Sequence, residues 1–383
     1  MKTLRKLLYL LQLEEYQNER YLDWLKRYRI QDLEERKNKL RWTTRTILTL
    51  VASFLFIPLF GEKRAVSFAN SLVDKISSPT KEIIIFLAKI KLMFYPKLIK
   101  IVITGSYGKT TLKEMLAYVL EHKYQVAKTP ANINTQIGIA LLVLRKINNR
   151  QQVLIIEAAA YQRGDIKAIC QLVKPNFGVI TSIGWMHLER FKTLENIRQT
   201  KMELVPFITD RQRLFLPTKD HEIIDPAKVC LSIGAQLNIS PSQIKKRIKL
   251  FAPPAHRLTT KRVSRDLVYL DDSYNSNPLG FRKALDELAK YKAYQKIIIT
   301  PGMIEFGKKQ NEINCEIAAE ATKICDIFLI VGKTNRESLA RGAKGAKRII
   351  FVEKNQTYET VLTPLLRPPT VILIENELPD HYF

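Results

Sequence analysis

The chain has 383 residues, 46% of them hydrophobic, which is enough to fill the cores of two or three domains and argues against general disorder. Its 62 Lys and Arg against 37 Asp and Glu give a net charge of +25, which favours anionic partners such as nucleotides, nucleic acid or a membrane without choosing among them. The four cysteines form no CxxC pair and no zinc-finger spacing, so we interpret them as reduced cytoplasmic thiols, most of them in the core.

Residues 1–99 are predicted to form a helical N-terminal segment that associates with a membrane. The run 47–60 is 14 residues long and uncharged, which is shorter than the ~18–20 residues that a simple transmembrane helix needs. More than forty residues, many of them charged, precede it, so it is not an ordinary signal peptide. We expect a shallow insertion, for which a hairpin with 81–99 is one possible form. The alternative is a buried helical pair packed on the main domain.

From residue 100 short apolar runs alternate with helical patterns, which indicates βαβ units and a parallel sheet. The first block of predicted strands covers 101–104, 125–129, 153–157 and 177–181. A second block covers 258–263, 267–271, 296–300, 326–331, 348–352 and 370–374. Asp225-Pro226 and Ser240-Pro241 each have the pattern of a helix cap followed by proline. We therefore expect a central α/β domain over 100–254 and a Rossmann-like α/β domain over 255–383.

The strongest local motif runs from Gly105 through Ser106, Gly108, Lys109 and Thr110 to Thr111, directly after the first predicted strand. Glycines in such a turn let backbone N–H groups approach phosphate oxygens, and the start of the following helix adds positive potential. Lys109 is predicted to neutralise the terminal phosphates, and the Thr110 hydroxyl is predicted to ligate magnesium. The spacing is shorter than in the common P-loop, because only two residues separate Gly105 from Gly108.

This short loop, Thr-Gly-Ser-Tyr-Gly-Lys-Thr-Thr, resembles that of the Mur ligases, and the resemblance continues in family order to about residue 335. Further matching segments are Thr129 to Gly138, Ile155 to Ile166, Ile180 to Phe191, Thr200 to Glu203, His256-Arg257 and Leu270 to Pro278. Individually only the loop and Asp-Asp-Ser-Tyr-Asn-Ser-Asn-Pro are specific, whereas jointly all of them are. The resemblance is strongest to the branch that adds D-alanyl-D-alanine. It implies a ligase that uses ATP and Mg²⁺.

Three further residues are expected at a magnesium site. Glu157 ends a buried apolar strand, the usual place for a metal-binding carboxylate, and His187 lies just beyond the next strand, so both can meet at one sheet edge. The resemblance implies that Glu157, His187 and Lys201 hold magnesium together with Thr110. It also implies that Lys201 is carbamylated. Lys109, Lys201 and His187 are accordingly the expected catalytic residues.

The second α/β domain is expected to complete both binding sites. The resemblance implies that Arg257 and Asp272 contact ATP, together with the loop residues Gly105, Ser106, Gly108, Lys109, Thr110 and Thr111. It places Asn132, Asn134, Tyr274, Asn275 and Asn277 in segments that face the substrate. Taken alone, Asn-Ser-Asn-Pro at 275–278 would be only a turn followed by a helix start.

The implied reaction joins a carboxylate to an amine, with ADP and phosphate as products. We expect a muropeptide or other small-molecule acid, an amino acid or dipeptide amine, no nucleic acid and a monomer. The catalytic body is expected in the cytoplasm at the inner face of the membrane. Residues 1–99 do not resemble the family domain that holds the UDP-sugar, so the alternatives of a lipid-linked acid and of a non-catalytic nucleotide-binding scaffold stay open.

Overall fold

A computed structural model describes residues 2–36, 39–130, 133–274, 276–353, 356 and 358–382. The chain divides into two compact units, and the split does not follow the chain order. The first unit combines the residues up to Ile83 with those from Leu378 onward, and the second runs from Ile84 to Glu377. The last residues therefore pack with the N-terminal unit, although the sequence placed them in the second α/β domain.

The first unit is helical around a small leucine-rich core. Its elements are α1 Lys2–Leu13, α2 Asn18–Arg27, the 3-10 turn η1 Ile30–Asp32 and the first part of α3, Thr44–Met93. One face of α1, including Leu7 and Leu11, packs with Tyr21 and Trp24 of α2 and with Val66 of α3. The tail completes this unit, since the Tyr9 hydroxyl donates to Oδ2 of Asp380 at 2.7 Å and Trp24 Nε1 donates to the His381 carbonyl at 2.9 Å.

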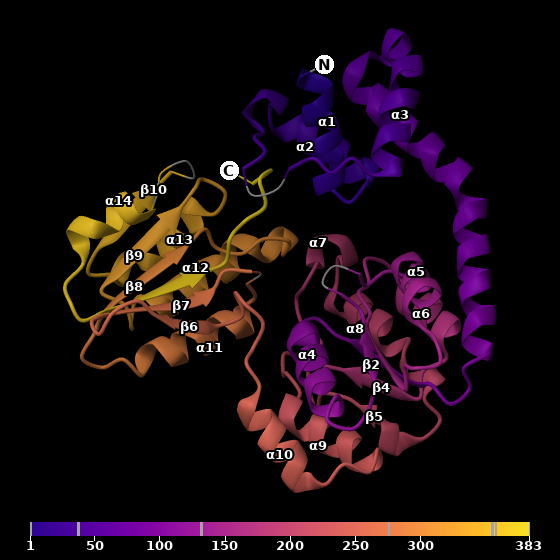
Figure 1. The fold of residues 1–383 in the computed structure, drawn as a ribbon. Helices are drawn as coiled ribbons and strands as arrows, with labels where there is room; N and C mark the ends of the chain where they lie inside the picture. Colours follow the sequence, from indigo (N-terminus) through magenta and orange to yellow (C-terminus); the bar gives the residue numbers. More distant parts are fainter. Residues whose placement is uncertain are drawn as a thin grey trace. The chain divides into compact units, whose positions relative to one another are not determined.

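Helix α3 is broken into two arms at Gly61, whose φ of 70° is not helical. The chain turns there, and the arm before Gly61 packs against the segment that follows it (Figure 1): Phe60 stacks on Phe68 with ring centroids 4.6 Å apart, and Arg45 donates to Asn70. A hairpin therefore forms, but the partner of 44–60 is the segment after Gly61. The predicted pairing with 81–99 is wrong, because a glycine turn joins adjacent segments and 81–93 continues the second arm.

The second unit contains two sheets. The first is fully parallel with order β2-β3-β1-β4-β5. Its strands are β1 Ile99–Thr104, β2 Val126–Lys128, β3 Val153–Glu157, β4 Phe177–Ile180 and β5 Leu214–Phe215. Its helices are α4 Lys109–Leu120, α5 Gln136–Lys146, α6 Asp165–Val173, α7 Leu188–Phe191, α8 Leu194–Met202, α9 Pro226–Gln236 and α10 Pro241–Leu250. Two 3-10 turns, η2 Val205–Phe207 and η3 Arg211–Arg213, follow α8.

Both faces of this sheet are covered, which makes three layers. Alternate residues of β1 point to opposite faces, as in any strand: Ile101 and Ile103 pack with α4, α9 and α10, whereas Val102 packs with α5, α6 and α8. Asp225 and Ser240 cap α9 and α10 and are followed by Pro226 and Pro241, as predicted. The central β1, flanked by β3 and β4, thus delivers its loop to the carboxyl edge of the sheet.

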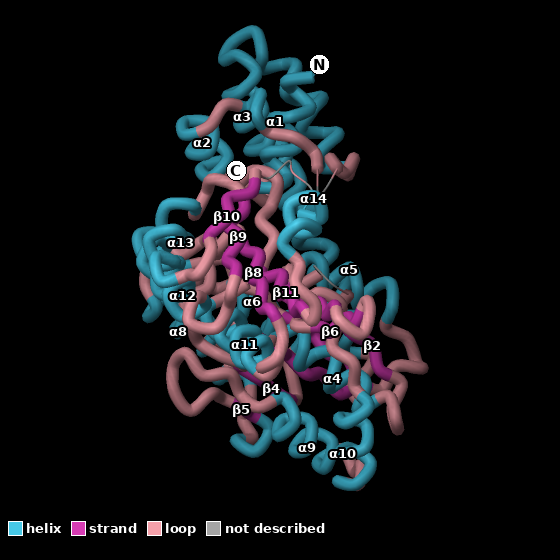
Figure 2. Tube along the Cα trace, turned by 90° about the vertical axis from the view of Figure 1, so that its left-hand side faces the viewer, coloured by secondary structure: helices cyan, strands magenta, loops and turns pink. Residues whose placement is uncertain are grey.

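The second sheet has order β10-β9-β8-β11-β7-β6, and Figure 2 shows its strands β10, β9, β8 and β11 following one another. All neighbouring strands pair in parallel except β6 with β7. Its strands are β6 Thr259–Arg262, β7 Leu267–Asp272, β8 Gln295–Thr300, β9 Ile327–Val331, β10 Ile349–Val352 and β11 Thr370–Glu375. Its helices are α11 Pro278–Ala289, α12 Gln310–Ala321, α13 Arg336–Gly342 and α14 Tyr358–Leu362, with the 3-10 turns η4 Gly307–Lys309, η5 Ala343–Gly345 and η6 Thr363–Leu365. The predicted class, a parallel-sheet domain followed by a Rossmann-like α/β domain, is confirmed.

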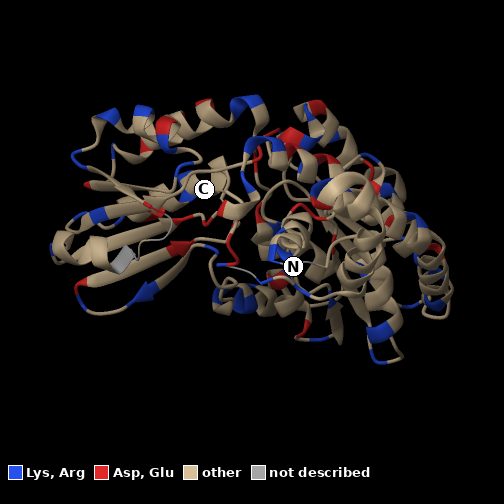
Figure 3. Ribbon diagram, turned by 90° about the horizontal axis from the view of Figure 1, so that it is seen from above, with Lys and Arg blue, Asp and Glu red and all other residues tan. Residues whose placement is uncertain are grey.

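The basic residues are spread over the fold. Lys and Arg recur along helices and loops in most of the view in Figure 3. Three cysteines, Cys170, Cys230 and Cys325, are buried, and burial raises the pKa of each thiol to about 12. All four are free thiols, as expected for reduced core residues.

Candidate active site

The loop after β1 has the geometry of a phosphate cradle. Gly105 has φ 138°, and a Cβ there would lie 2.1 Å from Oγ1 of Thr181, so no larger residue fits. The loop is fixed to the neighbouring strand end, because the N–H groups of Ser106 and Tyr107 donate to the carbonyl oxygen and the hydroxyl of Ser182. Gly108 begins α4 with φ 80° and provides no side-chain cap, so the first-turn N–H groups of α4 have no side-chain acceptor from the cap. These groups are available to an anion.

Lys109 folds back over this loop. Its Nζ donates to the carbonyl oxygens of Gly105 at 2.8 Å and Ser106 at 3.1 Å. Burial lowers the pKa of Lys109 to about 8; the Glu157 carboxylate opposes this shift and the Arg257 charge adds to it. The charges of Arg257 and Lys109 therefore act on each other, which brings a predicted ATP residue of the second sheet near the loop of the first. Polyphosphate oxygens are stronger partners for this ammonium than two carbonyl oxygens.

Thr110 and Glu157 meet at the end of β3. The Thr110 hydroxyl donates to Oε1 of Glu157 at 3.1 Å, as expected for two groups predicted to share a cation. The other carboxylate oxygen lies 3.3 Å from Nζ of Lys113, a fully buried lysine that also donates to the Thr129 carbonyl at 2.8 Å. Thr129 in turn accepts a bond from the Glu157 N–H at 2.9 Å. Glu157 is thus held on two sides before any ligand binds.

Lys113 was not predicted as a site residue. It lies one turn after Lys109, on the inner face of α4 with Leu112 and Leu116. The sequence signal that could have identified Lys113 is a lysine at a core position of an amphipathic helix, because a buried ammonium requires a partner of opposite charge.

Lys201 is 4% exposed, near the end of α8. Burial lowers its pKa to about 7, with a further lowering from Lys109 and opposition from Asp165 and Glu203. The same Glu203 carboxylate accepts from the N–H groups of Gly164 and Lys167 and so fixes the start of α6. A lysine with this pKa is largely a neutral amine above pH 7, and the charge of the phosphate-loop lysine Lys109 contributes to this lowering.

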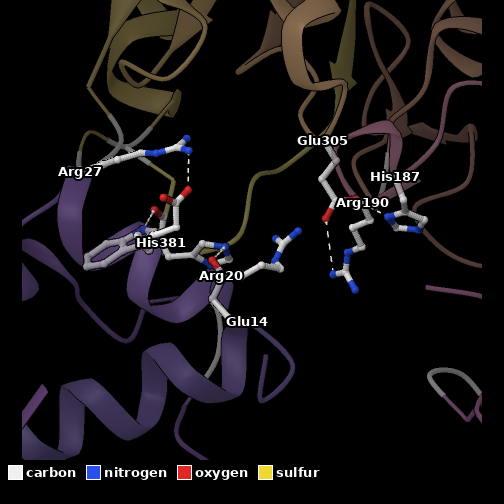
Figure 4. Close-up of polar contacts among 9 residues, drawn as sticks. Glu14, Arg20, Arg27, His187, Arg190, Glu305 and His381 are labelled. Carbon is white, nitrogen blue, oxygen red and sulfur yellow. Dashed lines mark hydrogen bonds and ion pairs between the residues drawn. The ribbon is translucent and has the colours of Figure 1, made fainter. Parts of the chain in front are cut away.

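His187 is held by a residue that sequence reasoning did not assign. Its Nδ1 is bonded to Oε2 of Glu305, in the loop after β8, and Figure 4 shows both side chains together with Arg190, which lies 3.9 Å from the same carboxylate. The backbone is joined at this point as well, since the Glu189 N–H donates to the Glu305 carbonyl at 3.1 Å. This loop of the second sheet therefore anchors the predicted metal-binding histidine.

The predicted residues of the second sheet lie around the β6–β7 pair. Oδ1 of Asp272 accepts from the Leu258 N–H at 2.9 Å, and the Arg257 guanidinium lies 4.3 Å from the centre of the Tyr274 ring. Burial raises the pKa of Asp272. Tyr274 is exposed and therefore accessible to a substrate.

The remaining predicted substrate residues are less informative. The Asn134 carbonyl accepts from the Ala159 N–H at 3.1 Å, so the segment of Asn134 lies beside the residues that come directly after β3. The Asn277 side chain caps α11 by accepting from the Gly280 N–H, which is the structural role that its sequence context allowed. Asn132 and Asn275 lie outside the described residues.

Glu375 was missed as well. It ends β11 fully buried, and its Oε1 accepts from the Ser276 hydroxyl. Within the described residues its Oε2 has no hydrogen-bond partner. Burial, reinforced by Asp272, raises the pKa of Glu375 well above its ordinary value.

The donor set fits magnesium in kind. Among the described residues no group of three His, Cys, Asp or Glu side chains could hold a metal ion by itself. A hydroxyl and a carboxylate beside a phosphate cradle are nevertheless the partial set that Mg²⁺ uses when substrate phosphates and water complete its shell. Thr110 and Glu157 provide that set.

Comparisons with known proteins extend over both sheets. The description "Mur ligase middle domain" matches residues 103–243, and "Mur ligase, glutamate ligase domain" matches 256–375. The UDP-N-acetylmuramoyl-tripeptide–D-alanyl-D-alanine ligase of Treponema pallidum is 26% identical over 74% of this chain and 72% of its own length. The Bacillus subtilis enzyme of the same name is 24% identical over 57% of this chain, which spans 59% of that enzyme.

Solved structures show the same fold. MurF from Acinetobacter baumannii superposes with a TM-score of 0.68 at 19% identity, covering 78% of each chain. MurF from Thermotoga maritima in complex with ADP gives 0.65 at 22% identity, over 78% of this chain and 80% of that one. The two domain matches together span most of the second unit, in the order that the motifs have in the sequence. The chain belongs to the Mur ligase family, whose members are ATP-dependent peptide ligases.

Proposed function

We propose that this chain forms a peptide bond between a muropeptide carboxylate and an amine at the expense of ATP. The observation that carries the proposal is the group at the carboxyl edge of the first sheet. Lys109 lies over a glycine cradle at the start of α4, and Thr110 bonds Glu157 beside it. Together these groups provide backbone donors, a cation and metal-ligand oxygens for a polyphosphate.

The chemistry follows from what such a site can stabilise. The substrate carboxylate attacks the γ-phosphorus, the bond to the β–γ bridging oxygen breaks, and ADP leaves with that oxygen. The amine then attacks the acyl phosphate carbonyl, releasing phosphate and one proton. Lys109 offsets charge on the transferring phosphoryl group, and Arg257 approaches the same region from the second sheet. Thr110 and Glu157 would hold magnesium, which would neutralise phosphate charge when bound.

Lys201 and His187 extend this site. A neutral amine reacts with CO₂ to give a carbamate and a proton, so the pKa of about 7 at Lys201 favours carbamylation and converts a cation into an anionic metal ligand. Glu305 accepts from Nδ1–H of His187, which leaves Nε2 as the ligand atom and fixes the ring orientation. Asp272 contributes to the nucleotide pocket, and Tyr274 and Asn134 contribute to the substrate side, whereas Asn277 caps α11.

The relatives are named for adding D-alanyl-D-alanine to a UDP-N-acetylmuramoyl tripeptide, and we propose the same pair of substrates here. The two family descriptions cover residues 103–243 and 256–375. They do not cover residues 1–99, so the part of the acid that lies away from its reacting carboxylate could be a group other than the UDP-sugar. A lipid-linked acid is the second candidate, because the arm 44–60 exposes large apolar side chains. We place the enzyme in the cytoplasm, where ATP is available, and expect a monomer.

Phosphate release measured with purified protein tests this function. Phosphate release should require ATP, Mg²⁺, the UDP-muramoyl tripeptide and D-alanyl-D-alanine together. Without the dipeptide, only a small fraction of the phosphate release should remain. Equal phosphate release with and without both acid and amine would identify a simple ATPase. No release with either the UDP-linked or the lipid-linked acid would support the non-catalytic scaffold.

A further inference from the structure

The arm 44–60 of α3 presents a continuous apolar face to the outside of the first unit. Seven large side chains of this arm are more than two-fifths exposed; Phe60 stacks on Phe68, and the other six are Ile47, Leu48, Val51, Phe54, Leu55 and Leu59. At roughly 100° per residue these six fall within an arc of roughly 140°, so they form one stripe along the helix. Over Thr44–Met93 the helix is long and apolar enough to cross a membrane, and 17% of its most apolar window is buried.

The inner face of the same arm combines buried hydroxyl groups with Leu50 and Ile57, which pack partly buried against the core of the first unit. Thr46, Thr49 and Ser53 are the fully buried residues on this side, and they lie toward the protein. Two of these hydroxyls form hydrogen bonds within their own helix: Thr49 Oγ1 donates to the Arg45 carbonyl, and Ser53 Oγ donates to the Thr49 carbonyl. Small side chains of the second arm, Ala65 and Ala69, are buried as well. The arm therefore buries three hydroxyl side chains and only part of Leu50 and Ile57, while the six exposed apolar side chains of the stripe face outward.

An aqueous environment does not favour this distribution of side chains on the arm. Exposing a Leu or Phe that could be buried is unfavourable in water, and helices in lipid instead pack through small and hydroxyl residues while apolar side chains face outward. The contact chemistry of this arm thus matches a lipid environment on one side and protein on the other. Because one side of the arm stays on protein, the arm would lie along a membrane surface.

Charge identifies the kind of surface. Residues 41–93 carry eight Lys and Arg against three Asp and Glu. Trp42 is half exposed beside Arg41 at the start of the arm, and Glu62, Lys63 and Arg64 follow directly after the turn at Gly61. Tryptophan and basic residues at both ends of an apolar helix are the usual anchors at a membrane–water interface.

We propose that the arm 44–60 lies in the interface of an anionic lipid bilayer, with the stripe Ile47–Leu59 in the acyl region and Arg41, Lys63 and Arg64 among the headgroups. The arm does not span the bilayer: its 17 residues reach about 25 Å, against about 30 Å of hydrocarbon. The charged triplet at Glu62–Arg64 would also have to cross. This inference is independent of the proposed catalysis.

Flotation of the full-length protein with lipid vesicles tests the proposal. Wild-type protein should float with vesicles of phosphatidylcholine and phosphatidylglycerol, and less with phosphatidylcholine alone. Leu55→Glu/Leu59→Glu should lower the vesicle-bound partition at least tenfold, since each buried leucine is worth about that factor. Leu250→Glu is the matched control, because Leu250 is 62% exposed on α10. This control should float as wild type does.

A second readout separates insertion from simple charge attraction. Binding of wild type should persist in part at 0.5 M salt, whereas Lys63→Glu/Arg64→Glu should reduce binding to the anionic vesicles only. Fluorescence of Trp42 should shift to the blue with vesicles, and a Trp42→Phe variant should lose that shift. The proposal is overturned if wild type does not float. It is also overturned if sedimentation shows a dimer that Leu55→Glu/Leu59→Glu dissociates while vesicle binding is unchanged, because a second copy would then cover the stripe.

Discussion

The ammonium of Lys109 lies 2.8 Å from the carbonyl oxygen of Gly105, in the loop that its own helix follows. The lysine is thus poised over the cradle at short range, and its pKa of about 8 leaves it mostly protonated at pH 7. This single relationship makes Lys109 the first residue to alter.

Lys109→Ala should lower ATP turnover by at least about 10²-fold, because a charge on the transferring phosphoryl group loses its nearest cation. Steady-state phosphate release measures the effect. Lys146→Ala, an exposed lysine at the end of α5, is the control and should keep full activity. Circular dichroism should show that both variants are folded, and wild-type turnover in Lys109→Ala would remove the phosphate-loop assignment.

Lys201→Ala should be inactive and partly rescued by formate or acetate, because the proposed missing ligand is an anion. Wild-type activity should fall when bicarbonate and CO₂ are removed. The loss should be greater below pH 7, where an amine with a pKa of about 7 becomes protonated and cannot react with CO₂. Full activity of Lys201→Ala without added carboxylate would make this lysine a bystander.

Glu375 should make stability depend on pH. Its folded pKa is raised, so between its unfolded pKa and that raised value the folded state binds the extra proton, and stability falls as pH rises. Glu375→Gln removes this proton linkage and should stabilise the fold more at pH 7 than at pH 4. Urea unfolding at pH 4 and at pH 7 measures it. A gain that is the same at both pH values would show that the carboxyl group does not titrate in this way.

The C-terminal tail should stabilise the first unit. Oδ2 of Asp380 accepts from the Tyr9 hydroxyl at 2.7 Å and from the Arg36 N–H at 3.0 Å. Glu14 forms an ion pair with Arg20 and lies beside the tail residue His381 (Figure 4). Asp380→Ala removes an acceptor of the buried Tyr9 hydroxyl and of the partly buried Arg36 N–H, which should cost about 1–3 kcal/mol. Hydrogen exchange in α1 and α2 should accelerate, while the two sheets keep their protection. Asp286 is exposed on α11, so Asp286→Ala should change neither the stability nor the hydrogen exchange of α1 and α2. Unchanged exchange in Asp380→Ala would show that the tail does not stabilise this unit.

Much of the first sheet could be predicted because its signals are local. The strand, glycine turn and helix start around Gly105–Thr111 are contiguous, so this local context predicted the cradle although its spacing is shorter than in the common P-loop. Asp225-Pro226 and Ser240-Pro241 likewise became the predicted helix starts. The two-residue β5 was missed, since a strand of that length has no detectable period.

The contacts that join distant segments could not be predicted. Glu305 reaches His187 across 118 positions, and Asp380 meets Tyr9 across 371. Such pairings depend on how whole elements pack, which periodicity does not encode. The apolar run of the arm 44–60 is evident in the sequence, but only the structure shows which of its side chains are buried and which are exposed.

The central claim is that a carboxylate is activated by phosphoryl transfer from ATP. It is tested most directly by supplying the UDP-muramoyl tripeptide with ¹⁸O in its reacting carboxylate, together with D-alanyl-D-alanine, and analysing the released phosphate by mass spectrometry. The account predicts one ¹⁸O atom in each phosphate, one ¹⁸O left in the new amide, and neither product from Lys109→Ala. Phosphate that carries only solvent oxygen, with the acid unchanged, would contradict it.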